Sequence, residues 1–356
     1  MILRRYIALN LVRGWLMVLL VVGSVFGLIA FITELERTRF DYDALAVARY
    51  TLSTLPQQLV GLAPVIALLG SIMALANLAR YNELTVISCA GVSRKSLLTA
   101  IALPTVLLMG LLWASLEFAT PRLHQVAEQQ RHYLRYRGDV RIPDGGVWSR
   151  NERRYVHLAR LDEKGVPGGI NLYEFDEDGK LVRTLSAGSA EVLSGRRWLL
   201  KRVREKRLVD GVFQTRGYPE LEVGGMWAQD ELPTLSLTAD SMTLSVLYRY
   251  GQFLRANGQS WRSYMGAFWQ KLALPLTVGA MVLLATPIAA SLGSRRNSNF
   301  GVNLGIGALI GILFYLGAQI IYALGQLLSL PVAVVAFLPT GIVLAVALML
   351  LRGMRW

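Results

Sequence analysis

The chain has 356 residues, 53% of them hydrophobic, and 37 lysines and arginines against 24 acidic residues give it a net charge of +13. This apolar fraction argues against an ordinary soluble enzyme, and positive charge on such a chain favours anionic lipid over nucleic acid as the partner. The single cysteine, Cys89, excludes a disulfide framework within the chain.

The chain opens with basic residues followed by an apolar run at 14–33. A run of about 20 residues is long enough to cross a bilayer. No small-residue cleavage pattern follows it, so we expect a retained anchor helix rather than a cleaved signal peptide. Five more apolar stretches of spanning length lie at 57–79, 97–117, 268–292, 301–328 and 331–351.

A polar block separates the third and fourth apolar stretches. Short segments in it alternate apolar and polar residues around turn signals such as DEDG at 176–179. Repeated at roughly 8–12-residue spacing, this pattern predicts a sandwich or jelly-roll domain. An amphipathic stretch leads back to the membrane, and there Lys271 is expected to extend its ammonium group to the membrane surface.

The predicted fold class is therefore an α-helical membrane protein. It has six transmembrane helices and an all-β, jelly-roll-like domain inserted between helices 3 and 4. The predicted domains are the first three helices with a short helix at about 82–91, the β domain with its connecting helices, and the last three helices. Their boundaries are 1–117, 118–267 and 268–356.

Basic residues in the short loops predict the orientation. Arg80, Arg94 and Lys95 flank the loop between the second and third spans, and Arg295 and Arg296 follow the fourth. All lie on one side if the N terminus is cytoplasmic. Both termini and the short helix are then cytoplasmic, and the β domain is periplasmic.

Motifs for catalysis or metal binding are missing from the sequence. It has no G-x-x-x-x-G-K-[ST], G-x-S-x-G, H-E-x-x-H or C-x-x-C pattern, so we predict no catalytic residue and no nucleotide site. His124 and His132 share a predicted helix but lack a third ligand, so we predict no metal site. A lipid-modifying enzyme is an alternative, with Glu117, His124 and Asp139 as its scattered candidates.

Between the second and third spans lies the stretch ARYNELTVISCAGVSRKS. Asn82 is expected as the N-cap of a short helix, Glu83 in its first turn and Gly91 at its end. Leu84 and Ile87 share one face of that helix. Two interpretations stay open on spacing alone: the helix docks in a groove of a soluble partner, or it lies on the lipid surface.

This stretch, together with LPQQLVGLAPVIALLGSIMALANL before it, resembles the LptF/LptG family of lipopolysaccharide-export permeases. FDYDALAVARYTLSTLP and LEFATPRLHQVAEQQR extend the resemblance, which covers nearly the whole chain and is nearer to the LptG branch. It implies a bacterial inner-membrane permease with six helices and a periplasmic jelly-roll domain. The ATP and Mg that drive transport would be bound by a separate ATPase.

The resemblance also implies a set of partners. An LptF-type permease would complete a heterodimer, and two copies of the ATPase LptB would bind on the cytoplasmic side. LptC would contribute a single membrane helix, and LptA would form the periplasmic bridge. This assembly would extract lipopolysaccharide from the inner membrane. An alternative is a mechanotransmitting permease-like protein that exports no lipid, although such proteins usually have four spans.

The resemblance implies that Glu83 corresponds to an acidic residue of the family that contacts the ATPase. Asn82, Leu84 and Ile87 would contact the ATPase beside it. The alternative is a solvated charge at a helix start.

Phosphates of lipid A call for basic groups at the outer rim, because arginine forks match phosphate geometry. The candidates are Arg37, Arg131, Arg135 and Arg39. They could equally be ordinary surface arginines, and the chain has Ala30 and Glu36 where the family has basic residues.

Small residues at GxxxG spacing mark the first and fifth spans, which form the lateral gates of the family. The expected gate and acyl-cavity residues are Gly23, Gly27, Leu28, Phe31, Ile32, Gly301, Gly305 and Gly311. Static packing within one subunit is the alternative. In the β domain, Val156, Leu158, Ile170, Leu172 and Phe175 would line a lipid path or form only the core.

Overall fold

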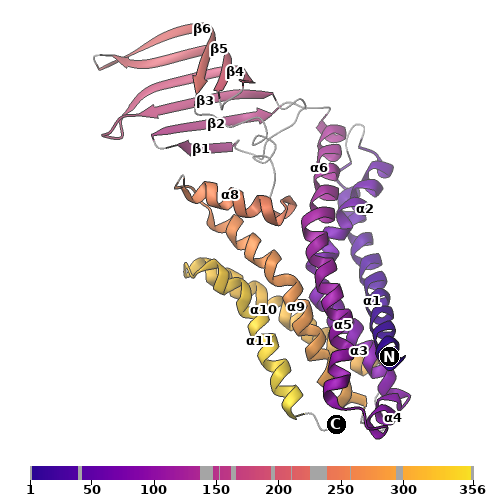
Figure 1. Ribbon diagram of the computed structural model, residues 1–356. Coiled ribbons are helices and arrows are strands. Elements are labelled where there is room, and N and C mark those ends of the chain that lie inside the picture. The colour runs from indigo at the N-terminus through magenta and orange to yellow at the C-terminus, as the bar shows by residue number, and fades with distance from the viewer. Residues whose placement is uncertain are drawn as a thin grey trace.

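The computed structural model describes residues 2–38, 42–136, 147–151, 153–161, 166–193, 197–209, 211–224, 239–256, 258–293 and 300–353. Long helices form a bundle, and an antiparallel sheet lies at one end of it (Figure 1). Both chain ends and the short helix α4 (Glu83–Cys89) lie at the opposite end (Figure 1). We call these two ends the sheet end and the α4 end.

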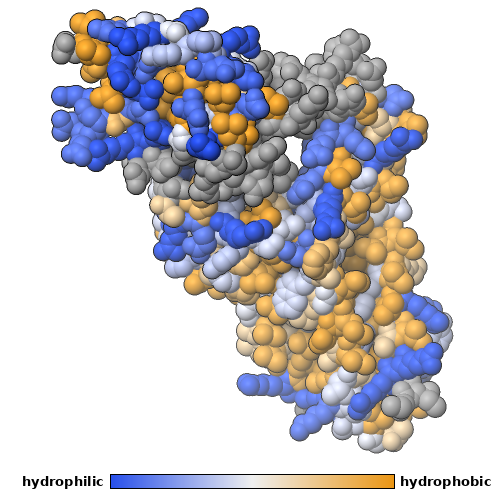
Figure 2. Space-filling model, turned by 45° about the horizontal axis from the view of Figure 1, so that its top comes forward, coloured by the Kyte–Doolittle hydropathy of each residue, from blue (hydrophilic) through white to orange (hydrophobic). Residues whose placement is uncertain are grey.

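Six helices in the described chain are long and apolar enough to cross a membrane, which confirms the six predicted spans. They are built from α1 (Ile2–Leu35), α3 (Ala63–Arg80), α5 (Arg94–Ala114), α9 (Arg262–Gly293), α10 (Phe300–Leu327) and α11 (Val332–Gly353). Figure 2 shows hydrophobic side chains over the middle of the bundle and hydrophilic ones on the sheet. Such an apolar belt is the surface that a bilayer requires.

The third span continues beyond the membrane-length stretch. A π-helical segment, Ser115–Ala119, joins α5 to α6 (Thr120–Tyr136) without a break. Helix α2 (Ala44–Gly61) lies beside α6 and α1 at the sheet end (Figure 1). It begins where the Asp43 side chain accepts the Ala46 N–H at 2.8 Å, the usual N-cap bond.

Two residues with positive φ flank α4. Gly91 has φ +78°, so it ends the helical turn as predicted. Asn82 has φ +58°, a left-handed conformation that asparagine tolerates better than most residues. Its carbonyl accepts the Val86 N–H at 2.9 Å, the first bond of α4, so Asn82 occupies the N-cap position as predicted, although its backbone is not extended. Its role is to turn the chain from α3 into α4.

The bundle core is formed by α3 and α9, which pack on each other, while α1 packs on α3 and α11 on α9. Helices α1 and α3 cross closely where Gly14 meets Gly70. A Cβ added at Gly70 would lie 2.8 Å from the backbone N and Cα of Trp15. Next to this crossing, the Trp15 indole N–H donates to the buried Ser71 hydroxyl at 2.9 Å.

Six strands in the middle of the described chain confirm the inserted β domain. They pair in sequence order as one antiparallel sheet, β1-β2-β3-β4-β5-β6. The strands are β1 (Val147–Asn151), β2 (Arg154–Leu161), β3 (Pro167–Phe175), β4 (Leu181–Leu193), β5 (Arg197–Val209) and β6 (Val212–Gly224). The chain then returns through a 3₁₀ turn, Ala239–Ser241, and α8 (Leu244–Ala256).

The sheet curls on itself. Arg154 on β2 donates to the carbonyl of Gly224 at the end of β6, at 2.7 Å. Four strand spacings in a flat sheet would put these residues at least about 19 Å apart, so the sheet must bend round. Along β4 and β5, the alternation of buried and exposed side chains shifts by one residue, near Arg202, which has φ +55°. Such irregularities are how strands turn corners in curled sheets.

Candidate functional site

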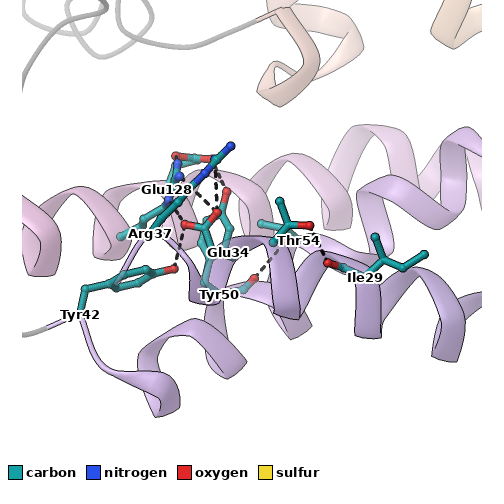
Figure 3. Close-up of polar contacts among 9 residues, drawn as sticks. Ile29, Glu34, Arg37, Tyr42, Tyr50, Thr54 and Glu128 are labelled. Atoms are coloured by element: carbon teal, nitrogen blue, oxygen red, sulfur yellow. Dashed lines mark hydrogen bonds and ion pairs between the residues drawn. The ribbon is translucent and has the colours of Figure 1, made fainter. Parts of the chain in front are cut away.

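A cluster of charged and phenolic side chains joins α1, α2 and α6 at the sheet end (Figure 3). Arg131 Nε donates to Glu34 Oε1 at 2.6 Å, and Arg131 Nη2 donates to Glu34 Oε2 at 3.3 Å. Arg131 Nη1 donates to Glu128 at 3.4 Å. The side chains of Arg131 and Glu34 are only 14% and 8% exposed, so solvent screens the pair weakly. We call Glu34, Tyr42, Tyr50, Glu128 and Arg131 the sheet-end cluster.

Two tyrosines complete the sheet-end cluster. The Tyr50 hydroxyl donates to Glu128 at 2.6 Å, and its ring stacks 5.0 Å from the Arg131 guanidinium carbon. The Tyr42 hydroxyl donates to Glu34 at 3.3 Å. Burial raises the pKa of Tyr42 to about 12, and the Glu34 charge adds to this effect. Burial likewise raises the pKa of Tyr50. Both phenols therefore stay protonated near neutral pH and serve as hydrogen-bond donors.

The four predicted phosphate-binding arginines are placed differently from one another. Arg131 lies inside the sheet-end cluster, with carboxylates on its guanidinium fork. Arg37 is 52% exposed and lies 3.5 Å from the Glu34 carboxylate. Arg39 lies outside the described residues, and only the backbone of Arg135 is described.

The predicted ATPase-contacting residues lie at the α4 end. Glu83 is the first residue of α4, and its carboxylate accepts the Tyr6 hydroxyl at 2.7 Å. Because Tyr6 lies near the start of α1, this bond ties the first helix to α4. Ile87 is half-buried, and only the backbone of Leu84 is described. Tyr6 and Glu83 are 77 residues apart, and no pattern in the sequence signals this contact.

The segment that returns from the sheet is fastened to three helices. Lys271 of α9 donates to the backbone carbonyls of Asp240 and Met242 at 2.7 and 2.8 Å. Gln57 of α2 donates to the same Asp240 carbonyl, and Gln125 of α6 donates to the carbonyl that follows it, each at 2.8 Å. Lys271 is 8% exposed, so the prediction that its ammonium reaches the membrane surface is wrong. Backbone carbonyls of the returning segment satisfy it instead.

The predicted gate residues of α1 divide between two faces. Cβ atoms added at Gly23 and Gly27 would lie 3.4 and 3.5 Å from leucine side chains of the chain's own α2. These are ordinary packing distances within one subunit. Leu28 and Ile32 are 60% and 52% exposed, and Phe31 is half-buried. This second face is free to meet lipid or another chain.

The predicted gate glycines of α10 also differ. A Cβ at Gly311 would lie 2.8 Å from a valine of α3, so this glycine lets α10 approach α3 closely. A Cβ added at Gly301 or Gly305 would have no described atom of another residue within 4 Å, apart from its chain neighbours and the backbone of its own helix. Their face of the helix is open in the described chain.

Four of the five apolar residues predicted for the β domain point into the curled sheet. Val156, Leu158, Ile170 and Leu172 are buried in one cluster and are part of the core of this domain. Burial of this kind is required for stability whether or not lipid also passes through. Phe175 is half-buried and packs edge-on against Tyr155 outside that cluster, so its predicted place in the interior is wrong.

The residues considered for an enzyme are dispersed. The Glu117 carboxylate accepts the backbone N–H and hydroxyl of Ser245 at 3.3 and 2.5 Å, at the start of α8. The buried His124 Nδ1 has no hydrogen-bond partner among the described residues, and Asp139 lies outside them. No group of three or more histidine, cysteine or acidic side chains in the described segments could hold a metal ion.

Comparison with known proteins gives a consistent match. The family model described as lipopolysaccharide export system permease LptF/LptG matches residues 5–353. The chain is 28% identical to the lipopolysaccharide export system permease protein LptG of Escherichia coli strain K12, over 98% of each chain. It is 27% identical to the protein of that name from Haemophilus influenzae, over 95% of this chain and 94% of the other. The protein thus belongs to the LptF/LptG family of lipopolysaccharide export permeases, as an LptG-type, multi-pass inner-membrane transporter subunit rather than an enzyme.

Proposed function

We propose that this chain is the permease subunit of an ATP-driven transporter that extracts lipopolysaccharide from the inner membrane and passes it to a periplasmic bridge. The full-length similarity to lipopolysaccharide export permeases carries this proposal. The second permease is LptF-type, and two copies of LptB supply ATP hydrolysis with bound Mg. LptC and the bridge protein LptA receive the lipid. No ATP or Mg site is assigned to this chain itself.

The termini and α4 face the cytoplasm in this proposal, and the sheet faces the periplasm. Support comes from their positions at opposite ends of the bundle (Figure 1). Helix α4 then contacts the ATPase through Glu83, with Asn82, Leu84 and Ile87 beside it. A conformational change passes through such a contact only if the contact is more favourable in one state than in the other. A carboxylate held by one hydrogen bond is well suited to this exchange.

Lipid A phosphates bind at the sheet end of α1 and α6, on Arg131 and Arg37. The chemistry of the guanidinium fork supports this assignment, because it presents paired N–H donors to an oxyanion. The exposed apolar face of α1, including Leu28 and Ile32, lies below these arginines and suits acyl chains. The lateral gate then forms between this face and the open α10 face at Gly301 and Gly305 of the second permease.

Purification from native membranes in mild detergent tests the proposal. We expect a second six-span permease, a cytoplasmic ATPase and bound lipopolysaccharide to be recovered together. Glu83→Ala should lose the ATPase or uncouple hydrolysis from lipid release, while Glu36→Ala, an exposed acid at the sheet end, should not. Recovery of this chain without an ATPase in several detergents would contradict the proposal. ATP hydrolysis without release of lipopolysaccharide from vesicles would indicate the mechanotransmitting alternative.

A further inference from the structure

The guanidinium of Arg131 is already satisfied by the protein's own carboxylates. Glu34 occupies the edge formed by Nε and Nη2, and Glu128 lies at Nη1. A carboxylate on this edge is the closest side-chain equivalent of a phosphate, since both present two oxygens to the fork. An arriving phosphate must therefore replace a carboxylate before Arg131 can bind it.

We propose that Glu34 is an internal competitor of the lipid phosphate at Arg131. Replacement of Glu34 by the phosphate frees α1 from α6 at the sheet end. This inference rests on the proposed function, in which Arg131 binds the phosphate, and adds a regulation of that site. Glu34 sets the affinity of the site, and ligand binding is linked to the position of the first helix.

Glu34 is the carboxylate that leaves, because it has other partners. The Tyr42 hydroxyl lies 3.3 Å from its Oε1, and Arg37 Nη1 lies 3.5 Å from its Oε2. A buried carboxylate without partners would be costly, so these two groups make the exchange feasible. Arg37 is half exposed and can follow the carboxylate as it moves.

Glu128 stays in place during the exchange. The Tyr50 hydroxyl donates to it at 2.6 Å, and Glu128 lies one helical turn from Arg131 on the same helix. Glu128 contacts Arg131 only at Nη1, at 3.4 Å, so it does not occupy the paired Nε and Nη2 edge that a phosphate needs. The exchange therefore concerns the interhelical bond, and the only helix it releases in this cluster is α1.

Charge explains why the competition matters. Glu34, Glu128, Arg37 and Arg131 sum to zero, so the closed cluster offers an incoming anion no net attraction. Removal of the Glu34 charge leaves one net positive charge and an open edge on Arg131. A weak site suits a lipid that must be bound and then passed onward, because tight binding would slow its release.

The test compares affinities for lipid A carrying its phosphates and for the same lipid without them, using the full permease complex in nanodiscs. Glu34→Gln should bind the phosphorylated lipid about tenfold more tightly than the wild type, the order expected for loss of one charged competitor. Glu177→Gln makes the same change of charge on an exposed side chain of the sheet, and its affinity should stay within about twofold. Arg131→Gln added to Glu34→Gln should abolish the gain.

The other possible results separate the failure of this inference from the failure of the proposed phosphate site. Weaker binding by Arg131→Gln with no gain in Glu34→Gln would refute the competition and leave the proposed phosphate site standing. No effect of Arg131→Gln would refute both. If Glu34→Gln does not fold, spin labels at exposed Leu35 and Gln130 in a Cys89→Ser background supply the second measurement. Phosphorylated lipid should lengthen their separation and dephosphorylated lipid should not; an unchanged distance at saturation would overturn the release of α1.

Discussion

Gly70→Ala should destabilise the protein at the crossing of α1 and α3. The new Cβ would lie 2.8 Å from the N, Cα and Cδ1 atoms of Trp15, and two of these are backbone atoms that cannot rotate away. Overpacking of this kind costs about 1–3 kcal/mol. The shift would also strain the buried bond from Trp15 to Ser71, which is worth about 1 kcal/mol. The free energy of unfolding of Gly70→Ala is therefore expected to fall by about 2–4 kcal/mol.

Gly23→Ala is the matched control for this prediction. It lies on α1 where that helix packs on α2, and its Cβ would meet only a flexible leucine methyl group at 3.4 Å. Both changes gain the same helix propensity, so the difference between the two variants reports the clash alone. Unfolding of the full chain in detergent, followed by tryptophan fluorescence, measures that difference. A Gly70→Ala protein as stable as Gly23→Ala would refute the reasoning.

Three further variants test other contacts. Tyr6→Phe removes the bond to Glu83 and should lower the coupling of ATP hydrolysis to lipid release by a few fold without loss of folding, measured as lipid released per ATP. Lys271→Met removes the side-chain donor to the Met242 carbonyl and leaves the Asp240 carbonyl with Gln57, so it should cost about 1–3 kcal/mol, with faster amide exchange at 239–242. Burial raises the pKa of Glu205, but hydrogen bonds from Arg183 and Tyr218, with the Arg183 and Arg207 charges, together outweigh it and hold that pKa below the ordinary value. The ion pair of Glu205 and Arg183 therefore stabilises the sheet at pH values above the ordinary carboxyl pKa, and this stability is lost as the pH falls through the lowered pKa of the folded protein. Glu205→Gln should lower the melting temperature at pH 7 and make that temperature depend less on pH in the acid range.

The sequence predicted the architecture because its signals are local. An apolar run of about 20 residues is long enough to span a bilayer wherever it occurs, and all six runs became helices. Alternation around DEDG at 176–179 became β3 and β4, because period two is the period of a strand. The end of α4 was also predicted, since Gly91 supplies the positive φ that the turn needs.

The polar contacts could not be predicted in the same way. Glu34 and Arg131 are 97 residues apart, and nothing in either sequence segment signals the other. Arg131 alone looks like a free cation available to phosphate, yet Glu34 from another helix occupies its guanidinium, together with Glu128 from its own helix. Lys271 looks like a surface cation for the same reason, but the returning segment brings carbonyls to it. A charge is read from sequence, whereas its partner depends on which helices pack together.

Helix α1 connects the two places where function is proposed. It spans 34 residues, about 51 Å, and is held by Tyr6 to Glu83 at one end and by Glu34 to Arg131 at the other. The Tyr6 contact is one hydrogen bond and the Glu34 contact is a two-bond ion pair, and a partner or ligand can replace either, whereas the Gly14 crossing between them is tightly packed. Tyr6 lies eight residues and Glu34 twenty residues from Gly14, so a rigid tilt about the crossing moves the sheet end about 2.5 times as far as the α4 end. A tilt that displaced the α4 end by about 1 Å would move Glu34 by about 2.5 Å, and in the direction away from α6 this would lengthen its bond to Arg131 beyond hydrogen-bonding range.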